Sequence, residues 1–164
     1  MNGLFGMALA LTLSVGAAAS AGAQIGIPVG SKAPGAEVHK LDGTAADLSQ
    51  YVGKSPVLIE FWATWCPVCK KLEPQMLDLA KRYGSRVKFL GVAVSVNESP
   101  RRVQLYAEKY GYPYELVFDT DGNAVTAYDV PATSYIVVID ESGKVVYTGQ
   151  GADQDLEAAL KLAM

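Results

Sequence analysis

Apolar residues recur along this chain at two different spacings, which divide it into short strands and longer helices. Two runs, Val57–Ala63 and Val87–Val94, are apolar at nearly every position, which is typical of strands buried on both faces of a sheet. Between them, Pro67–Tyr83 carries apolar side chains at spacings of three and four, which predicts an amphipathic helix. A second helix is predicted at Pro100–Tyr110, because proline favours the first helical position.

Shorter predicted elements flank this centre. We expect strands at Glu37–Leu41 and Leu116–Phe118, a helical turn at Leu48–Tyr51, and turns at Asp42-Gly43 and Asp121-Gly122. At the C-terminal end we expect a hairpin of Tyr135–Ile139 with Lys144–Thr148, then a helix capped by Asp153 with Leu156, Leu160 and Ala163 on its inner face. Strands that alternate with helices and end in a hairpin and a helix predict a three-layer α/β sandwich.

The N-terminal end has a different composition from the rest of the chain. Residues 1–31 contain no charged side chain, and residues 4–23 are almost wholly apolar or small, ending in Ala21-Gly22-Ala23. This pattern predicts a signal peptide over residues 1–23, although the Lys or Arg that usually opens one is missing. An uncleaved anchor is the alternative, since about 20 apolar residues can span a bilayer. Many of these residues are small, which favours cleavage.

We therefore predict a linker at residues 24–35 and one exported domain at residues 36–164. Export to the periplasm would place the cysteines in an oxidising compartment. The chain has 164 residues, of which half are apolar and 19% are charged, as expected for one globular domain. The net charge of −3 gives no basic surface, so nucleic acid is not an expected partner.

Both cysteines lie in the stretch ATWCPVCKK, residues 63–71. A disulfide between Cys66 and Cys69 closes a very short loop and would stabilise the fold by only about 2 kcal/mol. Cys66 stands just before the predicted helix, where free amides, the helix dipole and two following lysines should lower the pKa of its thiol. Cys69 begins the buried stripe. An exposed, nucleophilic Cys66 and a sheltered, resolving Cys69 are the arrangement of thiol–disulfide exchange.

Two other interpretations of the cysteine pair stay open on spacing alone. One is a purely structural disulfide. The other is half of a zinc site, but zinc takes about four ligands and the chain offers only two cysteines and His39, so a closed site would need a dimer. A CxxC next to a strand and a helix favours redox chemistry, and we expect no metal.

The segment VLIEFWATWCPVCKKLEP resembles the active-site segment of the thioredoxin superfamily, including Pro74 inside the helix. The similarity continues through GVAVSVNESPRRVQLYAEKYGYPYELVFDTDGNAVTAYDV and IDESGKVVYTGQG, and this longer segment is similar to the TlpA/ResA-like branch. It covers roughly residues 33–164. The resemblance implies a thioredoxin-like sandwich with a mixed central sheet, helices on both faces and a central strand–helix insertion.

The same resemblance implies a periplasmic or membrane-tethered reductase of protein disulfides. Such a protein needs no cofactor and receives electrons from a membrane donor of the DsbD/CcdA type. Members of this branch often serve cytochrome c maturation or metalloprotein assembly.

Several further residues are predicted to belong to the site. Glu60, the only charge in VLIEFWA, stands six residues before the first cysteine, where thioredoxins have a buried acid, and is expected to exchange a proton with Cys69. The alternative is that Glu60 faces solvent at the sheet margin. We expect Trp65 to form a partly exposed wall of the site, Trp62 to pack in the core, and Pro67 to contact substrate.

The sequence departs from the family at YDVPATSYIVVID. Thioredoxins place a cis-proline opposite the cysteines, and an alignment without gaps puts Ser134 at that position, with Pro131 three residues earlier. A gap beside a buried strand would reverse its faces, which favours Ser134. We therefore expect Thr133 and Ser134 to lie near the sulfurs and bind substrate. The alternative is that Pro131 takes the role through a local shift.

Two further functions remain as alternatives. A disulfide oxidase or isomerase differs from a reductase only in redox potential, which the sequence does not determine. A non-enzymatic Cu(I)-handling module is the second, because two thiolates suit Cu(I). Copper carriers of this fold add a downstream histidine, however, and none follows His39. A peroxidase is less favoured, because a peroxidatic cysteine does not need this WCxxC context.

Overall fold

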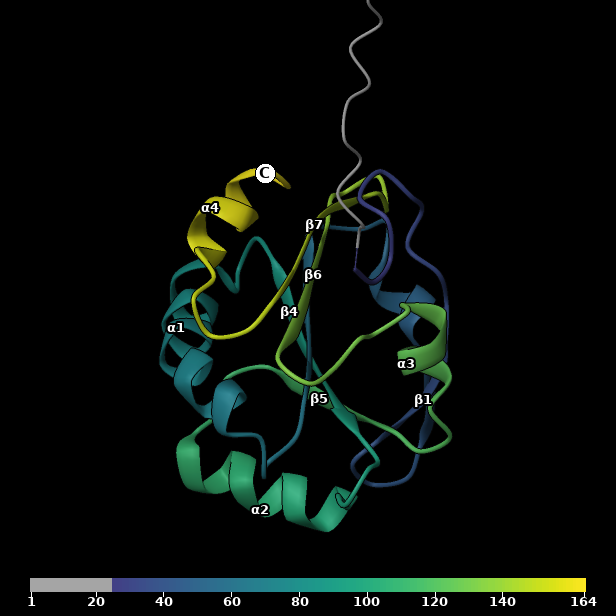
Figure 1. The fold of residues 1–164 in the computed structure, drawn as a ribbon, viewed down its shortest axis with the longest axis vertical. Coiled ribbons are helices and arrows are strands. Elements are labelled where there is room, and N and C mark those ends of the chain that lie inside the picture. The colour runs from purple at the N-terminus through teal and green to yellow at the C-terminus, as the bar shows by residue number, and fades with distance from the viewer. Residues whose placement is uncertain (1–24) are drawn as a thin grey trace, which may run out of the picture.

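A computed structural model describes residues 25–164 of the chain (Figure 1). The predicted signal peptide and its cleavage site lie outside the described residues. Within the described range, no helix is long and apolar enough to cross a membrane.

One seven-stranded sheet with the order β2-β1-β5-β4-β3-β6-β7 forms the middle of the molecule. The strands are β1 (Glu37–Lys40), β2 (Ala45–Asp47), β3 (Val57–Trp62), β4 (Lys88–Val94), β5 (Glu115–Asp119), β6 (Tyr135–Ile139) and β7 (Val145–Gln150). Strands β3, β4 and β5 are parallel, whereas β6 runs antiparallel to β3 and β1 runs antiparallel to β5. The predicted mixed sheet is confirmed.

Helices cover both faces of this sheet (Figure 1). They are the 3₁₀ helix η1 (Leu48–Tyr51) and the α-helices α1 (Pro67–Tyr83), α2 (Pro100–Tyr110), α3 (Asn123–Ala127) and α4 (Leu156–Lys161). Helices α1, α2 and α4 lie on one side of the sheet and α3 lies on the other. Apolar side chains of the strands fill both interfaces, and this burial is the main favourable contribution to folding. The predicted three-layer sandwich is confirmed.

The elements with strong periodicity have the predicted bounds, and the short ones account for most differences. Helices α1 and α2 and strand β6 begin and end at the predicted residues. Strand β2 and helix α3 were not predicted. Helix α4 is capped by Asp155, whose side chain accepts from the Ala158 amide at 2.9 Å, so the prediction of Asp153 as the cap is wrong.

The segment predicted to be a linker packs against the domain. Ile27 and Ala33 are buried in the core, and the Ile27 amide donates to the Tyr128 carbonyl at 3.1 Å. Farther along, the Gly30 amide donates to the Val145 carbonyl at 2.8 Å, and Lys32 forms a β-bridge with Lys144. Buried apolar residues and main-chain hydrogen bonds together hold this segment on the domain.

Candidate redox site

The cysteine pair lies where β3 passes into α1. Cys66 is the N-cap residue of α1, and Pro67 follows at the first helical position, where its missing N–H has no helical partner to lose. A disulfide joins Cys66 to Cys69, with the two Cα atoms 5.3 Å apart. The Cys69 amide donates to Cys66 Sγ at 3.0 Å. The amides at the helix terminus therefore do face the Cys66 sulfur, as the sequence predicted.

The exposure of Cys66 differs from the prediction. Its exposed fraction is 2%, close to the 3% of Cys69, so the expectation of an exposed Cys66 is wrong for the disulfide form. Both cysteines belong to an apolar cluster with Trp62 and Ala93. In the disulfide form, a reacting partner must therefore approach Cys66 past its exposed neighbours Trp65, Pro67 and Val68.

A buried carboxylate fixes the backbone immediately before Cys66. The Glu98 side chain has no exposed area, and its Oε2 accepts from the Thr64 amide at 2.8 Å and from the Thr64 hydroxyl at 2.6 Å. Its Oε1 accepts from the Ser99 amide at 3.0 Å. The indole of Trp65 donates to the Val96 carbonyl at 2.9 Å. The loop after β4 therefore holds the residues that carry Cys66.

Sequence analysis did not single out Glu98, because its partner Thr64 is 34 residues away. We expect Glu98→Ala to lower the free energy of unfolding by about 2–3 kcal/mol, since it leaves buried donors without their charged acceptor. Urea denaturation measures this. Glu108→Ala is the matched control, because exposed Glu108 accepts a hydrogen bond from the Gln104 side chain at the protein surface, and it should change stability by less than about 0.5 kcal/mol. Equal effects of the two variants would contradict this role of Glu98.

Glu60 is buried in the middle of the sheet rather than exposed at its margin. It lies in the middle of β3, between Gly91 of β4 and Ile136 of β6, and its exposed fraction is 3%. Burial raises the pKa of Glu60 to about 8, and the negative charge of Glu73 contributes to the increase. A carboxyl group with that pKa can accept and donate a proton near neutral pH. The alternative of a solvent-facing Glu60 is thus excluded.

A groove of about 330 Å³ is lined by Trp65, the residue that precedes Cys66. It brings together two of the predicted substrate-binding residues, Trp65 and Thr133, with Pro131 and Ala132. The remaining lining is aliphatic and was not predicted, and consists of Val94, Val96, Val125 and Val130. Trp65 is 43% exposed and lines the groove, whereas Trp62 is buried as expected. Pro67 is exposed but is not part of the groove lining.

Ser134 stands immediately before β6 and is not part of the groove lining. It is fully buried, its amide donates to the Phe61 carbonyl at 2.8 Å, and its carbonyl accepts from the Gly151 amide at 3.1 Å. Its φ of 64° is in the left-handed region, which serine seldom adopts. No peptide bond in residues 25–164 is cis, that of Pro131 included. That Ser134 rather than Pro131 approaches Cys66 stays a prediction.

The described residues offer the cysteine pair no third metal ligand. Across residues 25–164, no three His, Cys, Asp or Glu side chains cluster in a way that would hold a metal ion. His39, the third zinc ligand considered from sequence, lies on β1 with its Nδ1 3.1 Å from the Thr120 hydroxyl.

Comparisons with known proteins agree with this site. Residues 28–161 match the Redoxin family. The thiol-disulfide oxidoreductase ResA of Bacillus subtilis (strain 168) is 38% identical over 120 residues, which are 73% of this chain and 66% of that protein. The ResA of Geobacillus thermodenitrificans (strain NG80-2) is 33% identical over 138 residues, covering 82% of this chain and 78% of that protein.

Solved structures give the same result for the fold. A thiol:disulfide interchange protein of the thioredoxin family from Chlorobium tepidum TLS has a TM-score of 0.68 at 27% identity, covering 82% of this chain and 96% of that chain. The predicted thioredoxin-like fold and the resemblance to the TlpA/ResA-like branch are confirmed. The chain belongs to the Redoxin family and is a thiol–disulfide oxidoreductase.

Proposed function

We propose that this oxidoreductase works as a periplasmic reductase of protein disulfides. Cys66 attacks the substrate disulfide, and a mixed disulfide forms as one substrate thiolate leaves. Cys69 then gives up its proton to Glu60 and attacks Cys66, which releases the second substrate thiolate and leaves the Cys66–Cys69 disulfide. Trp65, Pro67 and Thr133 hold the substrate chain, and the buried Ser134 fixes the loop that carries Thr133.

The hydrogen bond to Cys66 is the observation that carries the reducing direction. Its sulfur accepts from the main-chain amide of Cys69, and a buried carboxyl, Glu60, lies in the strand that leads to it. A potential becomes strongly oxidising where the reduced form is strongly stabilised. One neutral main-chain donor stabilises the Cys66 thiolate less than a charged partner would, which favours the reducing end of the range.

A redox titration tests this direction. Equilibration of the purified domain with dithiothreitol or glutathione should give a potential nearer the thioredoxin value of about −270 mV than the DsbA value of about −120 mV. The reduced protein should also reduce the disulfides of insulin. A potential near the DsbA value would identify an oxidase instead.

The exported location and the membrane electron donor of the DsbD/CcdA type also belong to this proposal. They are supported by the uncharged N-terminal residues 1–31 and by the likeness to ResA proteins. A role in cytochrome c or metalloprotein maturation is proposed on the same resemblance.

Mass spectrometry of the protein from its native host should find Gln24, or a residue close to it, at the N-terminus. An intact Met1 in the cytosolic fraction would contradict export.

A further inference from the structure

The loop that leads into β6 is held in an unusual backbone conformation. Its last residue, Ser134, has a φ of 64°, in the left-handed region that is unfavourable for a residue with a Cβ atom. A residue in a regular antiparallel strand directs its amide and its carbonyl to the same neighbouring strand. Ser134 instead donates from its amide to the Phe61 carbonyl of β3 and accepts, at its carbonyl, from the amide of Gly151 after β7. The left-handed conformation thus joins the start of β6 to both of its neighbours.

The side chain of Gln154 fixes this arrangement from the far side. Gln154 lies between β7 and α4, and its exposed fraction is 8%. Its side-chain nitrogen donates to the Gly151 carbonyl at 2.6 Å and, in a longer hydrogen bond of 3.4 Å, to the Ser134 carbonyl. Its side-chain oxygen accepts from the Tyr147 hydroxyl at 3.1 Å. A buried amide bonded at both ends holds its partners in one geometry, because turning it would leave buried polar groups unpaired.

Strand β7 is shaped to admit this side chain. Gly149 has no Cβ, and one built there would clash with both the Tyr147 hydroxyl and Gln154 Oε1. The Ser134 hydroxyl adds a further contact, because it donates to the Gly151 carbonyl at 3.3 Å. These residues form one polar network that joins the loop before β6 to the segment between β7 and α4. None of its hydrogen bonds within the described part of the chain involves the cysteines.

The network reaches the groove that Trp65 lines. Residues 131–133 also line this groove. Thr133 is bonded directly to Ser134, and because a peptide unit is planar, the fixed Ser134 amide also sets the direction of the Thr133 carbonyl. Trp65 is held by a separate contact, since its indole donates to the Val96 carbonyl at 2.9 Å. Two independent sets of hydrogen bonds therefore fix Trp65 and residues 131–133.

We propose that Gln154 is a positioning residue for the substrate chain and acts through Gly151 and Ser134. It holds Ser134 in the left-handed conformation and so keeps residues 131–133 at a fixed place in the groove. This role rests on the proposed function, in which Thr133 helps to hold the substrate chain. A groove wall that is already ordered loses less conformational entropy when the substrate binds.

The unfavourable φ of Ser134 explains why a network is needed. Without Gln154, the contacts of Gly151 loosen and Ser134 can relax to the right-handed or extended φ that its Cβ favours. The Thr133 carbonyl and the groove wall would turn with it. Glycine adopts left-handed φ values about as readily as right-handed ones, so a glycine at position 134 would not depend on the network. The effect of Gln154 should therefore depend on the Cβ of Ser134, which a double-mutant cycle can measure.

Steady-state reduction of insulin, with dithiothreitol as the electron source, tests the role of Gln154. In Gln154→Leu the KM for insulin should rise about tenfold while kcat stays within about twofold of wild type, because hydrogen bonds that order the groove wall are lost and the cysteines are untouched. The redox potential should not change, nor should the rate with oxidised β-mercaptoethanol, a disulfide too small to need the groove. Gln104→Leu is the matched control, since Gln104 is an exposed glutamine that donates to Glu108 at 3.0 Å. It should leave KM unchanged.

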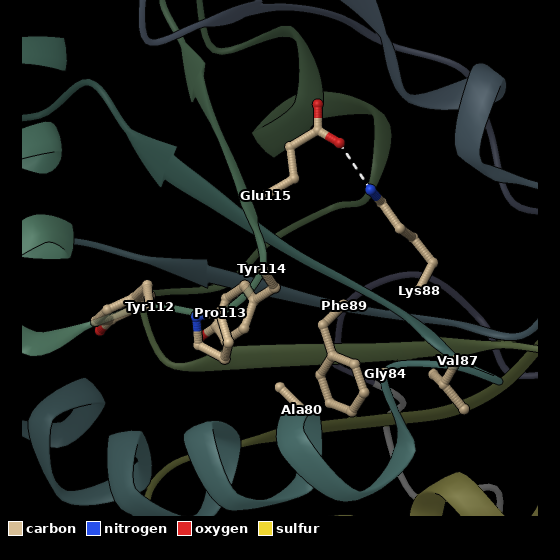
Figure 2. Close-up of a pocket in the computed structure, with 9 residues that line it drawn as sticks. All are labelled: Ala80, Gly84, Val87, Lys88, Phe89, Tyr112, Pro113, Tyr114 and Glu115. Carbon is tan, nitrogen blue, oxygen red and sulfur yellow. Dashed lines mark hydrogen bonds and ion pairs between the residues drawn. The ribbon is translucent and has the colours of Figure 1, made fainter.

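Two further variants test the path through Ser134. In a Ser134→Gly background, Gln154→Leu should raise KM by less than about threefold. Tyr147→Phe removes the hydroxyl that orients Gln154 and should raise KM by about threefold. Its matched control is Tyr51→Phe, which removes a hydroxyl that donates to Glu115. Figure 2 shows Glu115 at a second groove, which shares no lining residue with the first, so this control should leave KM unchanged.

An unchanged KM in Gln154→Leu would overturn the proposal, and so would a rise in KM that is equally large in the Ser134→Gly background. Should Gln154→Leu fail to fold, an unchanged KM in Tyr147→Phe would overturn it instead. Ala132→Glu, which places a charge in the groove itself, separates this result from the proposed function. If it raises KM and Gln154→Leu does not, the groove binds substrate and only the role of Gln154 fails. If neither raises KM, the role of the groove in the proposed function fails as well.

Discussion

Replacing Cys66 by Ser should reduce the exchange of protein disulfides to the uncatalysed background, whereas replacing Cys69 by Ser should leave the attacking step intact. The reason is the position of Cys66 at the N-terminus of α1, where its sulfur accepts a hydrogen bond from the main-chain amide of residue 69. That amide is main chain and persists in Cys69→Ser, so the Cys66 thiolate stays stabilised. Without the resolving thiol, the Cys69→Ser protein should accumulate mixed disulfides with its substrates.

Two assays measure this pair of variants. Alkylation by iodoacetamide near neutral pH should modify Cys66 in Cys69→Ser rapidly, and Cys69 in Cys66→Ser slowly. Non-reducing gels should show covalent substrate complexes for Cys69→Ser only. Retained insulin reduction in Cys66→Ser, or a faster-reacting Cys69, would show that the order of the cysteines is reversed.

Replacing Glu60 by Gln should remove a large part of the pH dependence of stability. The pKa of this carboxyl is raised from 4.5 to about 8 in the folded protein, first by burial and then by Glu73. Between those values the folded state retains a proton that the unfolded state has released. The free energy of unfolding therefore falls as pH rises through this window, by about 1.4 kcal/mol per pH unit for this one group, and is steady below it.

Urea denaturation of the oxidised protein at pH 5, 6, 7 and 8 measures this slope, which should be markedly flatter in Glu60→Gln. Glu115→Gln is the control. Burial alone would raise the pKa of Glu115, but hydrogen bonds from Lys88 and Tyr51 lower it overall, so this group titrates below the window and its removal should leave the slope unchanged. An equal slope in wild type and Glu60→Gln would show that Glu60 is already ionised in the fold.

In the reduced enzyme, Glu60→Gln should slow resolution by Cys69 and spare attack by Cys66.

The sequence by itself determined the elements whose signals are local. A proline at the first position, a run of apolar residues at helical spacing and a cap residue all lie within a few turns of one another, so the bounds of α1 and α2 and the cap position of Cys66 followed from them. Helix α3 could not be predicted in this way. It depends on the buried Asp119 carboxylate, which accepts hydrogen bonds from the Ala124 and Val125 amides. The sequence between them predicts only a turn at Asp121-Gly122.

Only the tertiary structure decided which residues meet at the cysteines. Thr133 joins Trp65 in one groove because β6 pairs with β3, and Glu98 reaches Thr64 because β4 lies on the other side of β3. The resemblance to thioredoxins implied a buried acid at Glu60, but the packing of Tyr106 against Trp62 appears only when α2 folds over the sheet. The burial of Cys66 is likewise a property of the packed disulfide. These contacts join residues far apart in the chain, and the energies of such contacts depend on distance in space, which local sequence patterns do not encode.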